Sequence, residues 1–225
     1  KGIFGYGGGY VSMTNLVSNA GVVATDTTGV GTARGYNAAA GYGIDKAIFA
    51  YGYTGSAVNM SNLVNNSGVV ATDVTGVGTA RMYLGASRYG LDKAIFGYGL
   101  AGSAVSITNL VTNVGVVGTD VSGVGTARRN ISATGFGSTG QAIFAFAYTG
   151  SVFTSLSNIV SNTGVVASDV AGTSGAKTNR SATNYGGDKA IFAFGYQESG
   201  DTYTNVRNLV SNVGVIAADA SGAGT

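Results

Sequence analysis

The chain contains no cysteine, histidine, proline or tryptophan among its 225 residues. Without cysteine it forms no disulfide and no thiolate metal site. Without histidine it lacks the commonest general base and metal ligand, so a Ser-His-Asp triad is impossible. Charge is also scarce, with 12 basic and 10 acidic residues, which is too little for a nucleic-acid-binding surface. No apolar run approaches the ~20 residues of a membrane span, and no secretory signal is visible.

Acidic side chains give little basis for catalysis or metal binding. Eight of the nine aspartates fall at two repeated positions, so only Glu198 and Asp201 stand outside them. No dense carboxylate spacing suggests calcium, and no Gly-x-x-x-x-Gly-Lys-Ser/Thr loop suggests a nucleotide. We therefore expect a protein that is not an enzyme and that carries no metal or cofactor.

What the chain has in abundance is repetition. The phrase Lys-Ala-Ile-Phe, or a close variant, starts at Lys1, Lys46, Lys93, Gln141 and Lys189, a period of 45 to 48 residues. Such a period is typical of one supersecondary unit stacked many times. We expect a single repeat domain over 1–225, with repeats 1–45, 46–92, 93–140, 141–188 and 189–225.

Each repeat has the composition of short β-strands. The 39 glycines of the chain oppose helix formation. In each repeat, four pieces rich in Val, Ile, Phe, Tyr and Thr are separated by Gly, Asn and Ser. Asn66-Ser67-Gly68 predicts a tight turn between the third and fourth pieces, because Asn and Gly tolerate positive φ. The small residues of Ala38–Ala40 suit a first strand crowded near a central axis. Four strands per unit predict an all-β, five-bladed β-propeller; an open β-solenoid or fibrous repeat is the alternative.

The order of these pieces resembles the kelch repeat. An Arg-led, Ala-rich strand from Ala80-Arg81 and an apolar strand such as Lys46–Gly52 carry the likeness, although the double glycine is reduced and the tryptophan is missing. The phrases Lys93–Gly99, Asn15–Asn19 and Gly21–Asp26 are also similar to repeats of tailed-bacteriophage virion and tail proteins. That resemblance implies a virion or extracellular location.

The repeats do not contain equal numbers of each strand. Second, third and fourth pieces occur five times, but the basic-led first piece occurs only from Arg34, Arg81, Arg128 and Lys177. We expect a short first blade, or a missing strand supplied by a neighbouring chain or a longer parent protein.

Three polar positions recur in every repeat, and we interpret them as structural. We expect turn-capping asparagines, aspartates that accept backbone N–H groups, and basic residues paired to a neighbouring blade. The alternative is a set of equivalent ligand sites. The adjacent pairs Asp45-Lys46, Asp92-Lys93 and Asp188-Lys189 are each expected to find partners elsewhere, since neighbouring strand residues face opposite ways. The recurring residues are Asn15, Asn62, Asn109, Asn158 and Asn208; Asn19, Asn66, Asn113, Asn162 and Asn212; and Asp26, Asp73, Asp120, Asp169 and Asp219.

The loop after the second strand varies between repeats and is the predicted binding site. Its tyrosines Tyr53, Tyr148 and Tyr196 offer rings for the apolar face of a sugar, and Thr54 and Thr149 offer hydroxyl groups. A second variable stretch follows each recurring basic residue. By contrast, Tyr6, Tyr51 and Tyr98 are expected to pack between blades, because Phe146 and Phe194 replace them. We expect a non-catalytic module that recognises cell-surface glycans; the alternative is a structural virion protein that docks onto other proteins or onto itself as a homo-oligomer.

Overall fold

The computed structural model describes residues 1–197, 200 and 202–222, and the described residues form strands and loops without a helix. The predicted all-β class is therefore confirmed. Glu198 and Asp201, the two acidic residues outside the repeated positions, lie outside the described residues. Within them, no helix has the length and apolar character needed to span a membrane.

The strands recur in the order that the repeats predict. The bounds are β1 Gly2–Gly5, β2 Thr14–Val17, β3 Ala38–Tyr42, β4 Lys46–Tyr53, β5 Ala57–Val64, β6 Gly85–Tyr89, β7 Lys93–Gly97, β8 Leu100–Ala101, β9 Ser103–Ala104, β10 Thr108–Val111, β11 Ser132–Phe136, β12 Gln141–Tyr148, β13 Phe153–Val160, β14 Lys177–Thr178, β15 Ser181–Tyr185, β16 Lys189–Ala193, β17 Tyr196–Gln197, β18 Thr202–Tyr203 and β19 Arg207–Val210.

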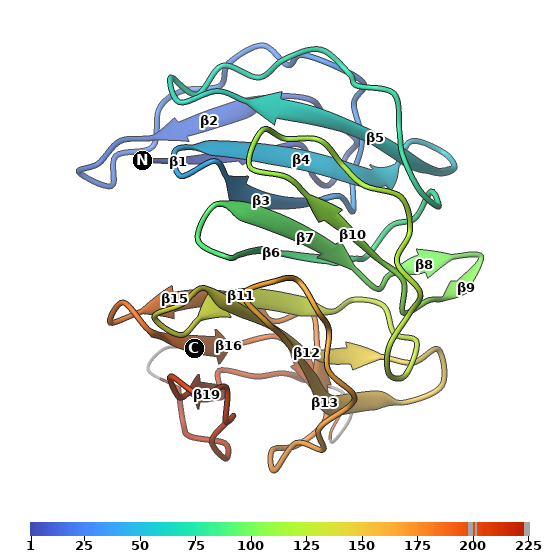
Figure 1. Cartoon of the computed structure of the whole chain (residues 1–225), viewed down its shortest axis with the longest axis vertical. Coiled ribbons are helices and arrows are strands. Elements are labelled where there is room, and N and C mark those ends of the chain that lie inside the picture. Colours follow the sequence, from blue (N-terminus) through green and yellow to red (C-terminus); the bar gives the residue numbers. More distant parts are fainter. Residues whose placement is uncertain (198–199, 201, 223–225) are drawn as a thin grey trace.

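These strands pair into five successive antiparallel sheets. The first sheet is β1–β2, the second β3–β4–β5, the third β6–β7–β10, the fourth β11–β12–β13 and the fifth β15–β16–β19; β14, β17 and β18 extend the fourth. A separate two-stranded sheet is formed by the hairpin β8–β9. Figure 1 shows them following one another from the blue end of the chain to the red end. The neighbouring first strands β3, β6, β11 and β15 lie in contact.

The fourth piece of each repeat is less regular than predicted. It returns beside the third strand through isolated bridges, such as Ser61 with Val74 and Val64 with Val70, and forms no named strand. The turn before it occurs where Asn66-Ser67-Gly68 predicts one, with Gly68 at φ 87°. However, its side-chain cap is the preceding Asn65, whose Oδ1 accepts the N–H groups of Ser67 and Val69 at 3.0 and 2.9 Å.

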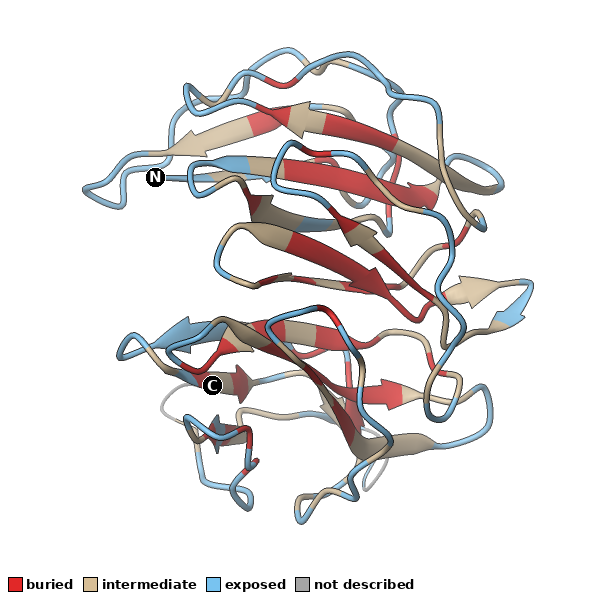
Figure 2. Cartoon of the chain, viewed as in Figure 1, coloured by how far each residue is buried: buried red, intermediate tan, exposed pale blue. Residues whose placement is uncertain are grey.

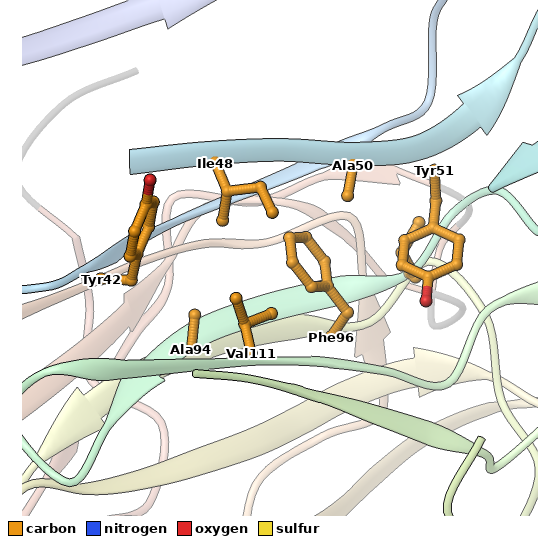
Figure 3. Packing of buried hydrophobic residues seen from close by; sticks show 8 residues of the cluster. Tyr42, Ile48, Ala50, Tyr51, Ala94, Phe96 and Val111 are labelled. Carbon is orange, nitrogen blue, oxygen red and sulfur yellow. The ribbon is translucent and has the colours of Figure 1, made fainter. Parts of the chain in front are cut away.

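One apolar cluster fills each space between neighbouring sheets (Figure 2). Between the second and third sheets, Ile48, Ala50 and Tyr51 of β4 face Ala94 and Phe96 of β7 (Figure 3). The ring centroid of Phe96 lies 5.5 Å from that of Tyr51, and Phe49, Phe144 and Phe192 likewise meet an aromatic ring of the sheet before them. The expected packing role of Tyr51 is confirmed, because the side chain is fully buried.

In the second to fifth sheets, a polar brace joins the sheet to the linker that precedes it. Asp73 accepts hydrogen bonds from the backbone N–H of Thr32 at 3.0 Å and from its hydroxyl at 2.6 Å. Asn62 donates to Asp73 at 2.9 Å and accepts from Arg34 at 2.6 Å. The guanidinium carbon of Arg34 lies 4.2 Å from the ring centroid of Tyr6 on the first sheet. The structural interpretation is therefore confirmed for Asp73, Asn62 and Arg34, whereas the predicted turn cap at Asn66 is wrong because Asn65 makes it.

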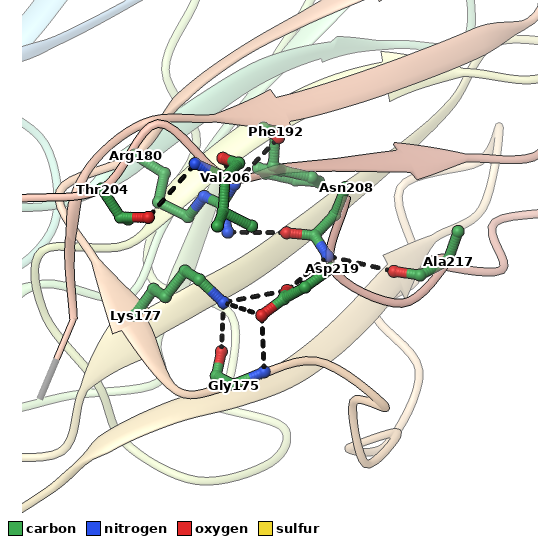
Figure 4. A network of polar contacts seen from close by, with 9 residues as sticks. All are labelled: Gly175, Lys177, Arg180, Phe192, Thr204, Val206, Asn208, Ala217 and Asp219. Carbon is green, nitrogen blue, oxygen red and sulfur yellow. Dashed lines mark hydrogen bonds and ion pairs between the residues drawn. The ribbon is translucent and has the colours of Figure 1, made fainter. Parts of the chain in front are cut away.

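In the brace of the fifth sheet, two basic residues make the contacts that one arginine makes in the second sheet (Figure 4). Lys177 pairs with Asp219 at 2.8 Å, whereas Arg180 donates to Asn208 at 2.7 Å and lies over Phe146. Arg180 stands outside the repeated basic positions, so the sequence alone did not mark it as structural.

Two of the three adjacent acid–base pairs bind internally, so the expectation that their members find partners elsewhere is wrong for them. Asp92 and Lys93 bind each other at 2.9 Å, and so do Asp188 and Lys189 at 2.8 Å. The aspartate of each pair lies in the turn before the strand, where the alternation of strand side chains does not apply.

Candidate functional site

The variable loops after the second strands lie on one side of the molecule, here called the loop face. Figure 1 shows the end of β4, the β8–β9 hairpin and the end of β12 together on the right. Bridges join the end of each second strand to the stretch that follows the recurring basic residue: Gly35 with Tyr53, and Arg129 with Tyr148. The two variable stretches of the sequence therefore meet at this face.

A ladder of four left-handed residues crosses the loop face. Tyr36, Tyr83, Asn130 and Asn179 have φ values of 55°, 57°, 54° and 53°. Each N–H of the last three donates to the carbonyl of the one before, at 3.1, 2.8 and 3.4 Å. Asparagine tolerates this conformation, whereas for tyrosine it costs about 1–3 kcal/mol. The ladder thus holds two phenol rings and two amides in fixed places, at a cost in backbone strain.

The aromatic end of the ladder forms a tyrosine cluster of Tyr10, Tyr36, Tyr53 and Tyr83. Ring centroids of Tyr36 lie 6.2, 6.4 and 4.4 Å from those of Tyr10, Tyr53 and Tyr83. Tyr10 and Tyr36 remain 44% and 43% exposed, and the other two rings are half-buried. Two rings of the cluster therefore offer accessible aromatic surface backed by further rings.

Two phenols of this cluster, those of Tyr10 and Tyr83, have a raised pKa, which favours their neutral form. Burial, followed by the neighbouring phenol of Tyr36, raises the pKa of Tyr10 and of Tyr83 above the usual value. A neutral phenol both donates and accepts hydrogen bonds, which suits a ligand rich in hydroxyl groups.

The other end of the ladder carries amides and a second aromatic group. The side chain of Asn130 donates to that of Asn179 at 2.9 Å. Beside them, Phe153 meets the rings of Tyr148 and Tyr196 at 5.3 and 5.9 Å. The guanidinium of Arg129 lies 4.9 Å from the ring centroid of Tyr148.

Of the five residues predicted from the sequence, the three tyrosines fall into these two groups and the two threonines do not. Tyr53 belongs to the tyrosine cluster, and Tyr148 and Tyr196 share contact with Phe153. Thr54 is exposed in its turn. The hydroxyl of Thr149 is engaged within its own turn, where it donates to the carbonyl of Val152 at 3.2 Å.

The sequence did not single out the more accessible rings of Tyr10 and Tyr36, nor Tyr83. Tyr36 and Tyr83 lie in the second variable stretch, so variation between repeats was the available signal. Their approach to Tyr10 and Tyr53 is tertiary, and no spacing along the chain encodes it.

A separate cavity lies between the first strands. Its volume is about 580 Å³, and small residues such as Ala40, Ser87 and Thr134 line it together with Arg88. The guanidinium of Arg88 donates to the carbonyl of Ile44 at 3.0 Å, so this cation already has a partner.

Acidic side chains do not gather into a metal site anywhere in residues 1–197, 200 and 202–222. Comparison of the chain with protein-family models and with curated proteins finds no match.

Proposed function

We propose that the five sheets are the blades of a β-propeller and that its loop face binds carbohydrate without catalysis. The blade arrangement is supported by the packing of each sheet on the next and by the cavity that the first strands share. The tyrosine cluster carries the functional proposal, because Tyr10 and Tyr36 combine exposed rings with fixed positions.

The chemistry of the cluster suits a sugar. An aromatic ring packs on the apolar face of a pyranose, and tyrosine gives a large rigid contact with few rotatable bonds. The amides of Asn130 and Asn179, further along the same ladder, add donors and acceptors for hydroxyl groups. The ladder crosses four sheets, so the face suits an oligosaccharide better than a single ring.

Cell-surface glycans are the proposed ligand class, and a virion or extracellular location is proposed from the resemblance of the repeats to those of bacteriophage tail proteins. Two aromatic groups on one face would add their affinities through avidity.

The test is a glycan array with labelled protein, with competition by free sugar. The double variant Tyr10→Ala/Tyr36→Ala should weaken binding about tenfold, since an aromatic contact is worth about 0.5–1.5 kcal/mol per ring. Tyr148→Ala/Tyr196→Ala tests the second aromatic group in the same way. The matched control is Tyr185→Ala, because that ring is 39% exposed but belongs to β15.

Competable binding that the control keeps and the Tyr10/Tyr36 variant loses would support the proposal. A blank array with folded protein would contradict it. So would equal binding by the Tyr10→Ala/Tyr36→Ala variant and the Tyr185→Ala control.

A structural role in an assembly is the second candidate, and a repeated apolar position favours it. The first valine after the turn glycine is 60–67% exposed in every repeat, at Val22, Val69, Val116, Val165 and Val215. Five equivalent apolar points are suited to contact with other proteins. Sedimentation analysis with Val69→Ser and Val116→Ser together should then show fewer subunits in the assembly; an unchanged sedimentation coefficient would count against this role.

A further inference from the structure

The first sheet lacks the inner strand that every other sheet possesses. β4 pairs with β3, β7 with β6, β12 with β11 and β16 with β15, whereas among the described residues β1 pairs only with β2. Beside β1 lies a cavity of about 910 Å³, lined by Ile3, Leu16 and Val17 of the first sheet and by Ala39 and Ala40 of β3. Lys46, Ala47 and Val64 of the second sheet line the same cavity, so it occupies the space between the first two sheets and reaches the first strand β3.

The polar brace of the first sheet is also half complete. Asn15 donates to Asp26 at 2.8 Å and to the carbonyl of Ala24 at 3.1 Å, as its equivalents do. Among the described residues, no threonine donates a hydrogen bond to Asp26, whereas Thr32 donates to Asp73. Likewise no arginine of the described residues donates to Asn15, whereas Arg34 donates to Asn62. Asn15 is accordingly half-buried, whereas Asn62 is fully buried.

The filled braces define what would complete this one. In the second sheet, the preceding linker supplies Thr32 and Arg34, which are separated by one residue, and it continues into the small-residue strand β3. Gly31 precedes them at φ 81°, and a Cβ there would stand 2.4 Å from an Asp73 oxygen. The recognised segment thus reads Gly-Thr-Ala-Arg followed by small residues.

We propose that the first sheet is the docking site for an extended segment of this type supplied by another polypeptide. The segment would add a strand to the edge of β1. Its threonine would donate a hydrogen bond to Asp26, and its arginine would donate one to Asn15. Strand addition to a free edge supplies backbone hydrogen bonds, and the carboxylate supplies charge complementarity for the arginine. Arg34, Arg81 and Arg128 are fully buried in their own braces, and Lys177 and Arg180 fill the fifth. These five described residues are therefore engaged in other sheets and do not complete the brace of the first sheet.

The proposal is independent of carbohydrate binding and is tested with a peptide. A labelled synthetic peptide with the sequence of residues 29–42 is titrated into the full chain, and anisotropy and melting temperature are recorded. We expect saturable 1:1 binding and a higher melting temperature. An Arg34→Gln peptide should bind about tenfold more weakly, because a charged hydrogen bond is lost.

The protein side of the contact is tested with Asp26→Ala, which should also weaken binding about tenfold. The matched control is Asp92→Asn, an aspartate that lies in the turn before β7 and pairs with Lys93. No saturable binding at millimolar peptide would overturn the proposal. So would equal affinity of both peptides together with no effect of Asp26→Ala. Chain dimers that form without peptide, and that Asp26→Ala disperses, would show that a second copy supplies the segment.

Discussion

The first and third sheets carry nearly the same sequence but bury it differently. Ile95, Phe96 and Val111 of the third sheet are fully buried, whereas the equivalent Phe4 is 63% exposed and Ile3 is only half-buried. The third sheet has a neighbour on each side, and the first has one. Burial here is set by the neighbouring repeat, as in proteins whose units contact only adjacent units.

The last sheet shows the same effect from the other side. Phe194 is 47% exposed, whereas its equivalents Tyr51, Tyr98 and Phe146 lie fully buried beneath an arginine of the next linker. The two end sheets thus expose complementary halves of one repeated interface: Phe4, Asn15 and Asp26 at one end and Phe194 at the other.

The largest contrast is expected from equivalent phenylalanines. Phe96→Ala removes a fully buried ring from the contact with Tyr51 and should lower the free energy of unfolding by about 3–5 kcal/mol. Phe4→Ala should change it by less than about 0.5 kcal/mol, since that ring is mostly in solvent. Urea unfolding measures both. Similar losses in the two variants would mean that the first sheet is covered as the third is.

A smaller contrast is expected from the repeated aspartates. Asp73→Ala leaves the N–H of Thr32 and the amide of Asn62 without their acceptor, which should lower the free energy of unfolding by about 1–3 kcal/mol. Asp26→Ala serves as the matched control and should have a smaller effect, because Asp26 bonds only to Asn15 among the described residues. An unchanged melting temperature for Asp73→Ala would reject the structural role of this position.

The cost of the Asp73 change should also depend on pH. Burial alone raises the pKa of Asp73, but hydrogen bonds from Thr32 and Asn62 outweigh it and hold the pKa below the usual range. A depressed pKa in the folded state stabilises the fold above the unfolded value near ~4 and loses this effect as pH falls further. The gap between the wild type and Asp73→Asn should therefore narrow below about pH 4. A gap that stays constant to pH 2 would contradict this account.

The sequence was a good guide wherever the structure is local to one repeat. The phrase Lys-Ala-Ile-Phe begins a second strand, Ala38–Ala40 lies on the small-residue first strand, and the turn at Asn66–Gly68 occurs as predicted. The structural role of the repeated Asp, Asn and Arg residues also followed from their regularity.

Features that depend on contact between repeats could not be predicted in the same way. Arg180 replaces the guanidinium of the repeated position from three residues away, because the fold and not the alignment brings it to Asn208. The tyrosine cluster likewise combines Tyr10 and Tyr36 of the first repeat with Tyr53 and Tyr83 of the second. Position in the sequence marked these loops as variable but did not show which rings meet.

Hydrogen exchange of the free protein tests most directly the claim that a sheet's burial is set by its neighbours. Amides of β1 and β2 should exchange faster, by orders of magnitude, than those of β7 and β10, because local opening is easiest where few buried contacts oppose it. Equal protection of the first and third sheets would contradict the account and show that the first sheet is already covered.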